Sequence, residues 1–154
     1  MLRNWLNEWN DIIRYIIWSD VQLKTLMKIP ANASILDFVD KYFIRMGYTD
    51  ETLSDQAVRI VYGEVGGGAD IPHVMKQEMS FDIYVKKSEL RNATNDRLQL
   101  RTHLIADRLN HLLTQKDNPH IGGYNFRVIG ETEMGTSVVG YTRLNISFEF
   151  FRTI

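Results

Sequence analysis

Residues 138–151 read Val-Val-Gly-Tyr-Thr-Arg-Leu-Asn-Ile-Ser-Phe-Glu-Phe-Phe. From Leu144 onward, the apolar residues Leu, Ile, Phe and Phe alternate with Asn, Ser and Glu. A β-strand has a side-chain period of two, so this pattern predicts a strand that buries one face and leaves the other wet or available to a neighbour. Only three residues follow Phe151, and we expect the C-terminus to belong to the sheet.

The composition is that of an ordinary globular protein. A length of 154 residues suits a hydrophobic core of useful size, and we expect residues 1–154 to form a single domain. The net charge is −1 and neither half of the chain is strongly basic, so the sequence does not indicate a general attraction to nucleic acid. There is no cysteine, which excludes disulfides and thiolate metal sites.

The N-terminus lacks the pattern of a secretory signal peptide. Its apolar run, residues 12–18, is interrupted by Arg14, and no small-residue cleavage site follows. The run is also too short to span a bilayer, so no membrane association is predicted. We expect the protein to be cytoplasmic when it is made.

The first fifty residues are predicted to form a helical layer. In residues 3–18, apolar side chains recur at spacings of three and four, which is typical of a helix with one buried stripe. Asp20 is a candidate N-cap for a second short helix, Val21 to Lys28, which Pro30 would stop.

Residues 34–46 leave two alternatives open. Ser34 as an N-cap and Gly47 as a stop favour a helix, whereas the run Tyr42-Phe43-Ile44 favours a strand. A helix would place the apolar residues of this segment on poorly aligned faces. We therefore favour an irregular or extended segment.

From residue 57 onward the sequence favours strands. The glycine-rich residues 63–73 are predicted to be a mobile loop, and residues 130–136 a polar turn. The elements expected around them are strands at 57–62 and 74–85, a helix that Asn95 or Asp96 caps and that ends near Leu113, and strands at 124–129 and 138–151.

The order of these elements predicts an α+β fold. Two helices precede the series β-β-α-β-β, and two hairpins separated by one long helix suggest a four-stranded, mostly antiparallel sheet. The N-terminal helical layer, residues 1–50, and the long helix would cover this sheet. Residues 57–154 would form the sheet-and-helix core.

Three consecutive glycines, Gly66 to Gly68, invite comparison with phosphate-binding loops. Such loops run directly into a helix N-terminus, but here Asp70 and Pro72 follow, and then a strand. We interpret the segment as a flexible hairpin loop, or as a loop that becomes ordered only against a neighbouring subunit.

No motif in the sequence predicts an enzyme. His103 and His111 are separated by eight positions on the long helix, which rotates them about 80° apart and makes them poor ligands for one metal ion. Glu131 and Glu133 are interpreted as surface charges of the polar turn, and no Gly-x-Ser-x-Gly elbow is present. We therefore expect no catalytic residue, no metal and no cofactor.

The long helix carries three arginines, Arg97, Arg101 and Arg108, on its flanks or outer face. They could face a nucleic acid duplex or acidic residues of a neighbouring subunit. A solvated helix face is the simplest interpretation.

The second half of the chain resembles a known group of proteins. A strand ending in Phe-Asp-Ile-Tyr-Val (81–85) leads to a long helix that contains Ile-Ala-Asp-Arg-Leu-Asn-His-Leu-Leu (105–113), and the final strand contains Tyr-Thr-Arg-Leu-Asn-Ile-Ser-Phe-Glu-Phe (141–150). In the order of their elements and in their general residue pattern, residues 57–154 are similar to the tail terminator and tail-completion proteins in the neck of tailed bacteriophages. In that family an α/β protomer assembles into a hexameric ring on the end of the tail tube.

The resemblance implies a structural protein of the virion. The ring would cap the tail tube protein, end its polymerisation and join it to the head-side connector protein; the alternative is another neck or head-completion adaptor. DNA would pass through the lumen without specific binding, and the protein would reside in the virion tail or neck after assembly in the host cytoplasm. The residues expected to contact subunits or partners are Gly66, Gly67, Gly68, Asp70, Glu131, Glu133, Asn145, Ser147 and Glu149.

Overall fold

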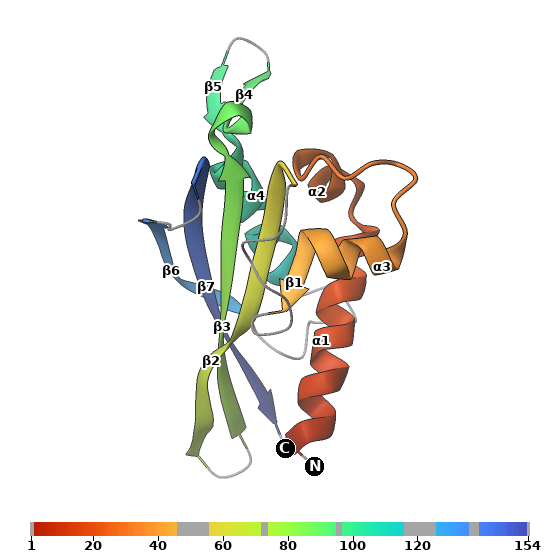
Figure 1. Cartoon of the computed structure of the whole chain (residues 1–154). Coiled ribbons are helices and arrows are strands. Elements are labelled where there is room, and N and C mark those ends of the chain that lie inside the picture. Colours follow the sequence, from red (N-terminus) through yellow and green to blue (C-terminus); the bar gives the residue numbers. More distant parts are fainter. Residues whose placement is uncertain are drawn as a thin grey trace.

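The computed structural model describes residues 2–45, 56–71, 74–94, 97–115, 126–135 and 139–153. Within these ranges five strands form one mixed sheet, in the order β1-β2-β3-β7-β6 (Figure 1). The strands are β1 (Phe43–Arg45), β2 (Val58–Ile71), β3 (Val74–Lys86), β6 (Arg127–Met134) and β7 (Tyr141–Thr153). Antiparallel pairing joins β2, β3, β7 and β6, while β1 adds to β2 in parallel. The predicted α+β class and antiparallel core are confirmed, and the sheet has one strand more than predicted.

The pairing of β3 with β7 fixes the two faces of the sheet. It runs without a register shift from Val74 opposite Thr153 to Lys86 opposite Tyr141. An uninterrupted antiparallel register keeps the period-two patterns of both strands in phase, so their apolar residues share one face. The alternation predicted for the C-terminal strand is confirmed in β7.

Helices cover the apolar face of the sheet (Figure 1). They are α1 (Leu2–Ser19), α2 (Val21–Leu26) and α4 (Arg101–Leu113). The two N-terminal helices confirm the predicted helical layer. Asp20 caps α2 as expected, because its carboxylate accepts a hydrogen bond from the backbone N–H of Leu23 at 2.8 Å.

The hydrophobic core fills the space between the helices and the sheet. At its centre Phe43 stacks on Tyr62 with 4.2 Å between ring centroids, and Phe81 meets Phe148 edge to face at 5.6 Å. Buried aliphatic side chains from helices and strands pack around these rings, namely Ile13, Ile17, Leu23, Ile83, Ile105, Leu109 and Ile146. Because both layers contribute to the same core, the helical layer and the sheet stabilise each other.

The prediction of an irregular or extended segment at residues 34–46 was wrong for residues 35–42 and is confirmed for residues 43–45, which form the extended strand β1, while Met46 lies outside the described residues. Ser34 caps a helical turn, α3 (Ile35–Asp37), and a π-helical turn, η1 (Phe38–Tyr42), continues it before β1 begins. The helix signal and the strand signal are therefore both satisfied, one after the other. The rings of Phe38 and Phe43 stack with 5.4 Å between centroids in the core, which favours this abrupt change of conformation.

The prediction of a mobile loop at residues 63–73 was also wrong for residues 63–71, and residues 72 and 73 lie outside the described residues. Strand β2 continues to Ile71, and Gly66, Gly67 and Gly68 lie opposite residues of β3. Register shifts after Glu64 and after Ala69 mark irregularities in the pairing. Glycine weakens a strand when it stands in the strand interior, but here pairing with β3 keeps the backbone extended. The register shifts also fit the composition, because bulges commonly contain glycine.

Two other boundaries differ from the prediction because long-range pairing prevails over local signals. A separate hairpin of β4 (Arg91–Thr94) and β5 (Arg97–Leu100) occupies the expected start of the long helix. Strand β6 extends to Met134, where a turn was predicted, because these polar residues pair with β7.

The hairpin β4–β5 and the hairpin β2–β3 project toward opposite ends of the molecule (Figure 1). Gly47, Asn95, Asp96 and Tyr124 lie outside the described residues.

Candidate functional site

The sheet face turned away from the helices carries a buried polar network. Asp82 of β3 and Asn145 of β7 are cross-strand partners. The Nδ2 amide of Asn145 donates to Asp82 Oδ1 at 2.8 Å and to Ser80 Oγ at 2.5 Å, and Ser147 Oγ donates to Asn145 Oδ1 at 3.0 Å. Arg143 Nη2 donates to Asp82 Oδ2 at 2.9 Å. Side chains therefore join β3 to β7 in addition to the backbone pairing.

Asp82 is the centre of this network. It is only 5% exposed and accepts hydrogen bonds from both Arg143 and Asn145. Charge-assisted hydrogen bonds of this kind are strong, and removal of one partner leaves the other buried without its counter-charge. Asn145 and Ser147 lie opposite the core as the alternation predicted, and they are bonded within the protomer. Their role in a partner contact stays a prediction.

Glu149 forms a second cluster near the end of β7. It is 3% exposed, and its carboxylate lies between Arg127 of β6, which donates to it, and Lys76 of β3, whose Nζ is 3.4 Å away. One buried acid thereby connects three neighbouring strands. The sequence pattern placed Glu149 on the polar face, but its two cationic partners come from distant segments and carried no local signal.

Arg59 of β2 is an unexpected feature of the same face. Its side chain is fully buried, and its guanidinium lies 5.2 Å from the ring centroid of Tyr84 and 5.4 Å from that of Tyr141. Within the described part of the chain, none of its three guanidinium nitrogens has a hydrogen-bond partner. The only sequence signal was one charged residue inside the apolar run Val58-Arg59-Ile60-Val61-Tyr62, and it was missed. Cation–π contacts offset part of the cost of burying this charge.

Replacing Arg59 by methionine is expected to raise the free energy of unfolding by about 1–4 kcal/mol. Methionine fills a similar space without a buried charge, and such replacements of buried ionic groups are often stabilising. Urea denaturation of the wild type and of Arg59→Met measures the difference. Arg59→Ala is the control, since it also removes the charge but leaves a cavity. A loss of stability in Arg59→Met would show that the contacts of the guanidinium, including those with the two tyrosine rings, outweigh the cost of burying its charge.

Strand β6 is an open edge of the sheet. All eight of its residues are exposed, including Glu131 and Glu133. Among the described residues no strand pairs with its outer edge, and it presents the apolar side chains of Val128, Ile129 and Met134. An edge with open backbone groups and exposed apolar side chains is a template for contact with another chain.

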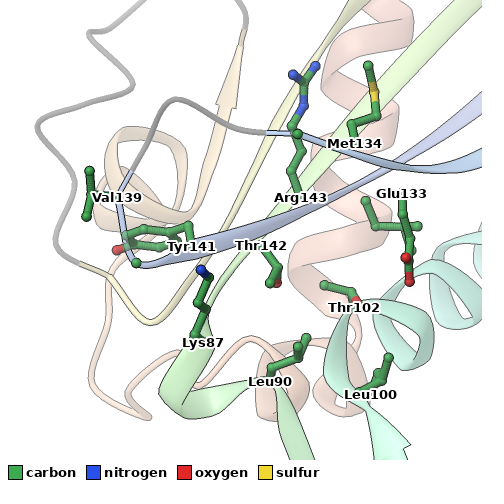
Figure 2. Close-up of a pocket in the computed structure, with 13 residues that line it drawn as sticks. Lys87, Leu90, Leu100, Thr102, Glu133, Met134, Val139, Tyr141, Thr142 and Arg143 are labelled. Atoms are coloured by element: carbon green, nitrogen blue, oxygen red, sulfur yellow. The ribbon is translucent and has the colours of Figure 1, made fainter.

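A cavity of about 610 Å³ lies beside the end of β6 and the start of β7. In Figure 2, Thr142 of β7 points toward Leu90, Leu100 and Thr102, while Lys87 and Glu133 stand on opposite sides. The lining mixes apolar side chains with one acid and two cations, Lys87 and Arg143. Such a lining suits contact with a polypeptide segment.

Two of the three arginines associated with the long helix hold elements of the fold together. Arg101 is buried and donates to the backbone carbonyls of Glu89 at 2.8 Å and Leu26 at 2.9 Å. Arg108 forms a two-point ion pair with Asp20, with N···O distances of 2.9 and 2.6 Å. The interpretation of these two residues as a solvated face was wrong, because each binds α4 to a neighbouring segment. The side chain of Arg97 lies outside the described residues.

The ion pair of Asp20 with Arg108 predicts a measurable acid sensitivity. The hydrogen bond from Arg108 holds the pKa of Asp20 below its ordinary value of 3.8 in the folded protein. A depressed carboxyl pKa contributes stability that is present above the unfolded-state pKa and lost as the pH falls through the folded-state pKa. We therefore expect Asp20→Asn, which keeps the N-cap, to lose less stability than the wild type between about pH 5 and pH 2. Thermal unfolding over this range tests the difference, and parallel curves would contradict it.

The predicted contact residues are distributed over both faces of the sheet. Gly66, Gly67, Gly68 and Asp70 lie in the distal part of β2. Glu131 and Glu133 lie on β6 at the level of Ile146 and Leu144, on the helical side, where Glu133 is 3.2 Å from His103 Nε2 of α4. Asn145, Ser147 and Glu149 lie on the opposite side of β7. They are therefore not gathered in one cleft.

The long helix α4 exposes side chains of the types that can bind metal ions. His103, Asp107 and His111 are exposed on α4, and no group of three or more His, Asp or Glu side chains in these ranges is placed to hold a metal ion. None of the described helices has the length and apolar character needed to cross a membrane.

These features define an α+β protein whose sheet is cross-linked by buried ion pairs on one face and has an exposed edge strand. The sequence profile of the YomW family matches residues 10–150, and the chain belongs to this family. The family carries a phage-derived name, which suggests a phage protein and specifies no role in the tail. None of the curated proteins matches the chain.

Proposed function

We propose that this protein is the tail terminator of a phage neck. It forms a ring that caps the tail tube, ends tube polymerisation and joins the tube to the head connector. The observation that carries the proposal is the exposed edge strand β6 with its apolar side chains, because a protomer that acted alone would leave this surface in water. Membership of a family with a phage-derived name supports a phage protein, which is the broader part of this proposal.

The shape of the protomer supports a position between two partners. The hairpin β2–β3, which contains Gly66 to Gly68 and Asp70, projects at one end of the molecule, and the hairpin β4–β5 projects at the other (Figure 1). A ring that joins a tube to a connector needs a separate contact surface at each of its ends. We assign one hairpin to each partner.

The charge distribution supports a lumen that DNA can pass without specific binding. The net charge is −1, so the protein as a whole does not attract a polyanion. Arg101 and Arg108 are engaged in internal hydrogen bonds and an ion pair. They are therefore not available as a phosphate-binding row.

Removal of the protein from an infecting phage tests the function. Electron microscopy of the lysate is expected to show tails of uncontrolled length, or heads and tails that are not joined, and expression of the wild-type protein in trans should restore normal particles. Normal joined particles in its absence would refute the proposal. Cross-linking in assembled particles separates the terminator from another neck adaptor: the terminator cross-links to tube protein, and a head-completion adaptor cross-links only to head-side protein.

A further inference from the structure

The two edges of the sheet are built differently. At one edge, β1 has only three residues, and its Phe43 and Ile44 are buried. At the other edge, β6 has eight residues, all of them exposed, and among the described strands only β7 pairs with it. Very short edge strands are one of the devices by which proteins avoid unwanted pairing, so the protein protects the β1 edge and leaves the β6 edge open.

An open strand edge selects an extended polypeptide as its partner. The outward N–H and C=O groups of β6 form a row with which another strand can pair, and main-chain hydrogen bonds of this kind supply affinity for many sequences. The side chains of the added strand supply specificity, because every second residue lies on the same face. The charges along β6 therefore decide which segment fits.

Two carboxylates project from the helical side of this edge. Glu131 lies opposite Ile146 of β7. Glu133 lies opposite Leu144, and both of these β7 residues belong to the core. Glu131 and Glu133 are thus two positions apart on one face of an exposed strand. Residues directly opposite each other in paired strands are close enough for unlike charges to attract and like charges to repel.

The arginines near this edge do not occupy the same face. Arg127 and Arg143 lie on the opposite face of the sheet, where each donates to a buried acid. Lys87 stands across the cavity from Glu133 (Figure 2), and the contact of Glu133 is with the exposed ring of His103 at 3.2 Å. The helical side of the β6 edge therefore presents acidic side chains to an added strand.

Charge argues against a second copy of this chain as the partner. If β6 paired antiparallel with β6 of another copy over its full length, Glu131 would lie opposite its own equivalent. The two acids favour a strand with basic residues two positions apart, and no two of the 18 lysines and arginines in this sequence have that spacing. The segment that fits belongs to a different protein.

We infer that β6 is the docking strand for an extended segment of a partner protein that carries Lys or Arg at two positions separated by one residue. The segment adds to the sheet beside β6, with its two basic side chains opposite Glu131 and Glu133. The inference deepens the proposed function, on which it rests for the existence of a protein partner, and names the chemistry that recognises that partner.

Three synthetic peptides with the length of β6, eight residues, test the inference on the full chain. The first has two lysines separated by one residue in a background of valine and threonine. The second has glutamates in place of the lysines. The third has the composition of the first, but its lysines are adjacent, so they project on opposite faces of a strand. NMR titration gives the Kd of each peptide, and hydrogen exchange identifies the backbone amides that become protected.

The first peptide is expected to bind at least about tenfold more tightly than the second, since two attractive cross-strand pairs replace two repulsive ones. The third is expected to have an intermediate Kd, and the newly protected amides should lie in β6. The double variant Glu131→Lys/Glu133→Lys is expected to prefer the glutamate peptide. The matched control Asp11→Lys/Asp40→Lys makes the same charge change on exposed residues of α1 and η1 and should bind like the wild type.

The possible failures are distinguishable. Equal Kd values for the three peptides, no binding of the first peptide, protection outside β6, or an unchanged lysine preference in Glu131→Lys/Glu133→Lys would each overturn the inference. These results leave the terminator function standing, because removal of the protein from the phage tests that function separately. Normal joined particles after that removal would refute the terminator function, and the peptide measurements would still decide whether β6 accepts a basic strand.

Discussion

Replacing Asp82 by alanine is expected to lower the free energy of unfolding by about 3–5 kcal/mol. The carboxylate is buried and accepts hydrogen bonds from Arg143 and Asn145. Without it the guanidinium of Arg143, whose side chain is only 25% exposed, loses this counter-charge, and breaking a largely buried pair in this way is far more costly than the net worth of the pair. A loss of this size is a large share of the stability of a typical domain.

Urea denaturation measures this effect. An m-value equal to that of the wild type would show that both proteins unfold in the same two-state manner. Asp82→Asn is the informative comparison, since it keeps the shape and one acceptor but removes the charge, and it should lose less stability than Asp82→Ala. A change below about 1 kcal/mol in Asp82→Ala would show that the network is not a stabilising element of the sheet. Because the network joins β3 to β7, we expect Asp82→Ala also to reduce the yield of soluble protein.

Replacing Phe81 by alanine is expected to cost a similar amount, about 3–5 kcal/mol, through a different mechanism. The ring is fully buried, and its centroid lies 6.1 Å from that of Tyr62 and 5.6 Å from that of Phe148. Alanine would leave a cavity between β2 and β7 that these large rings cannot close without leaving their own contacts.

Phe81→Leu separates cavity formation from the loss of aromatic contacts. Leucine fills most of the space, and its cost should be well below that of alanine. Thermal and urea unfolding of both variants measure the difference. Equal destabilisation by alanine and leucine would show that ring geometry, and not volume, dominates at this position.

Local sequence patterns predicted the regular parts of the fold. The alternation in residues 144–151 and in residues 74–85 reports strand faces directly, because side-chain direction depends only on neighbouring positions. The helical stripe of residues 3–18 and the Asp20 cap are equally local signals. These are the elements that the structure confirms.

The errors occurred where distant segments determine the conformation. Gly66 to Gly68 have little strand propensity, yet they pair with β3, which lies at hydrogen-bonding distance after the hairpin closes. Residues 130–134 look like a turn but are held by β7. The hairpin β4–β5 replaces the start of a helix because its two short strands pair with each other. In each case backbone pairing across the chain outweighs a weak local preference.

The sequence by itself determined which side chains of β7 face the core and which face away, because a period of two needs no knowledge of the rest of the molecule. Only the tertiary structure decided what the outward side chains do. The register of β3 against β7 places Asp82 beside Asn145, and the addition of β6 brings Arg127 to Glu149. It also decided that, among the described strands, β6 is an open edge, since whether a strand has a neighbour depends on the order of strands in the sheet and not on the residues of the strand.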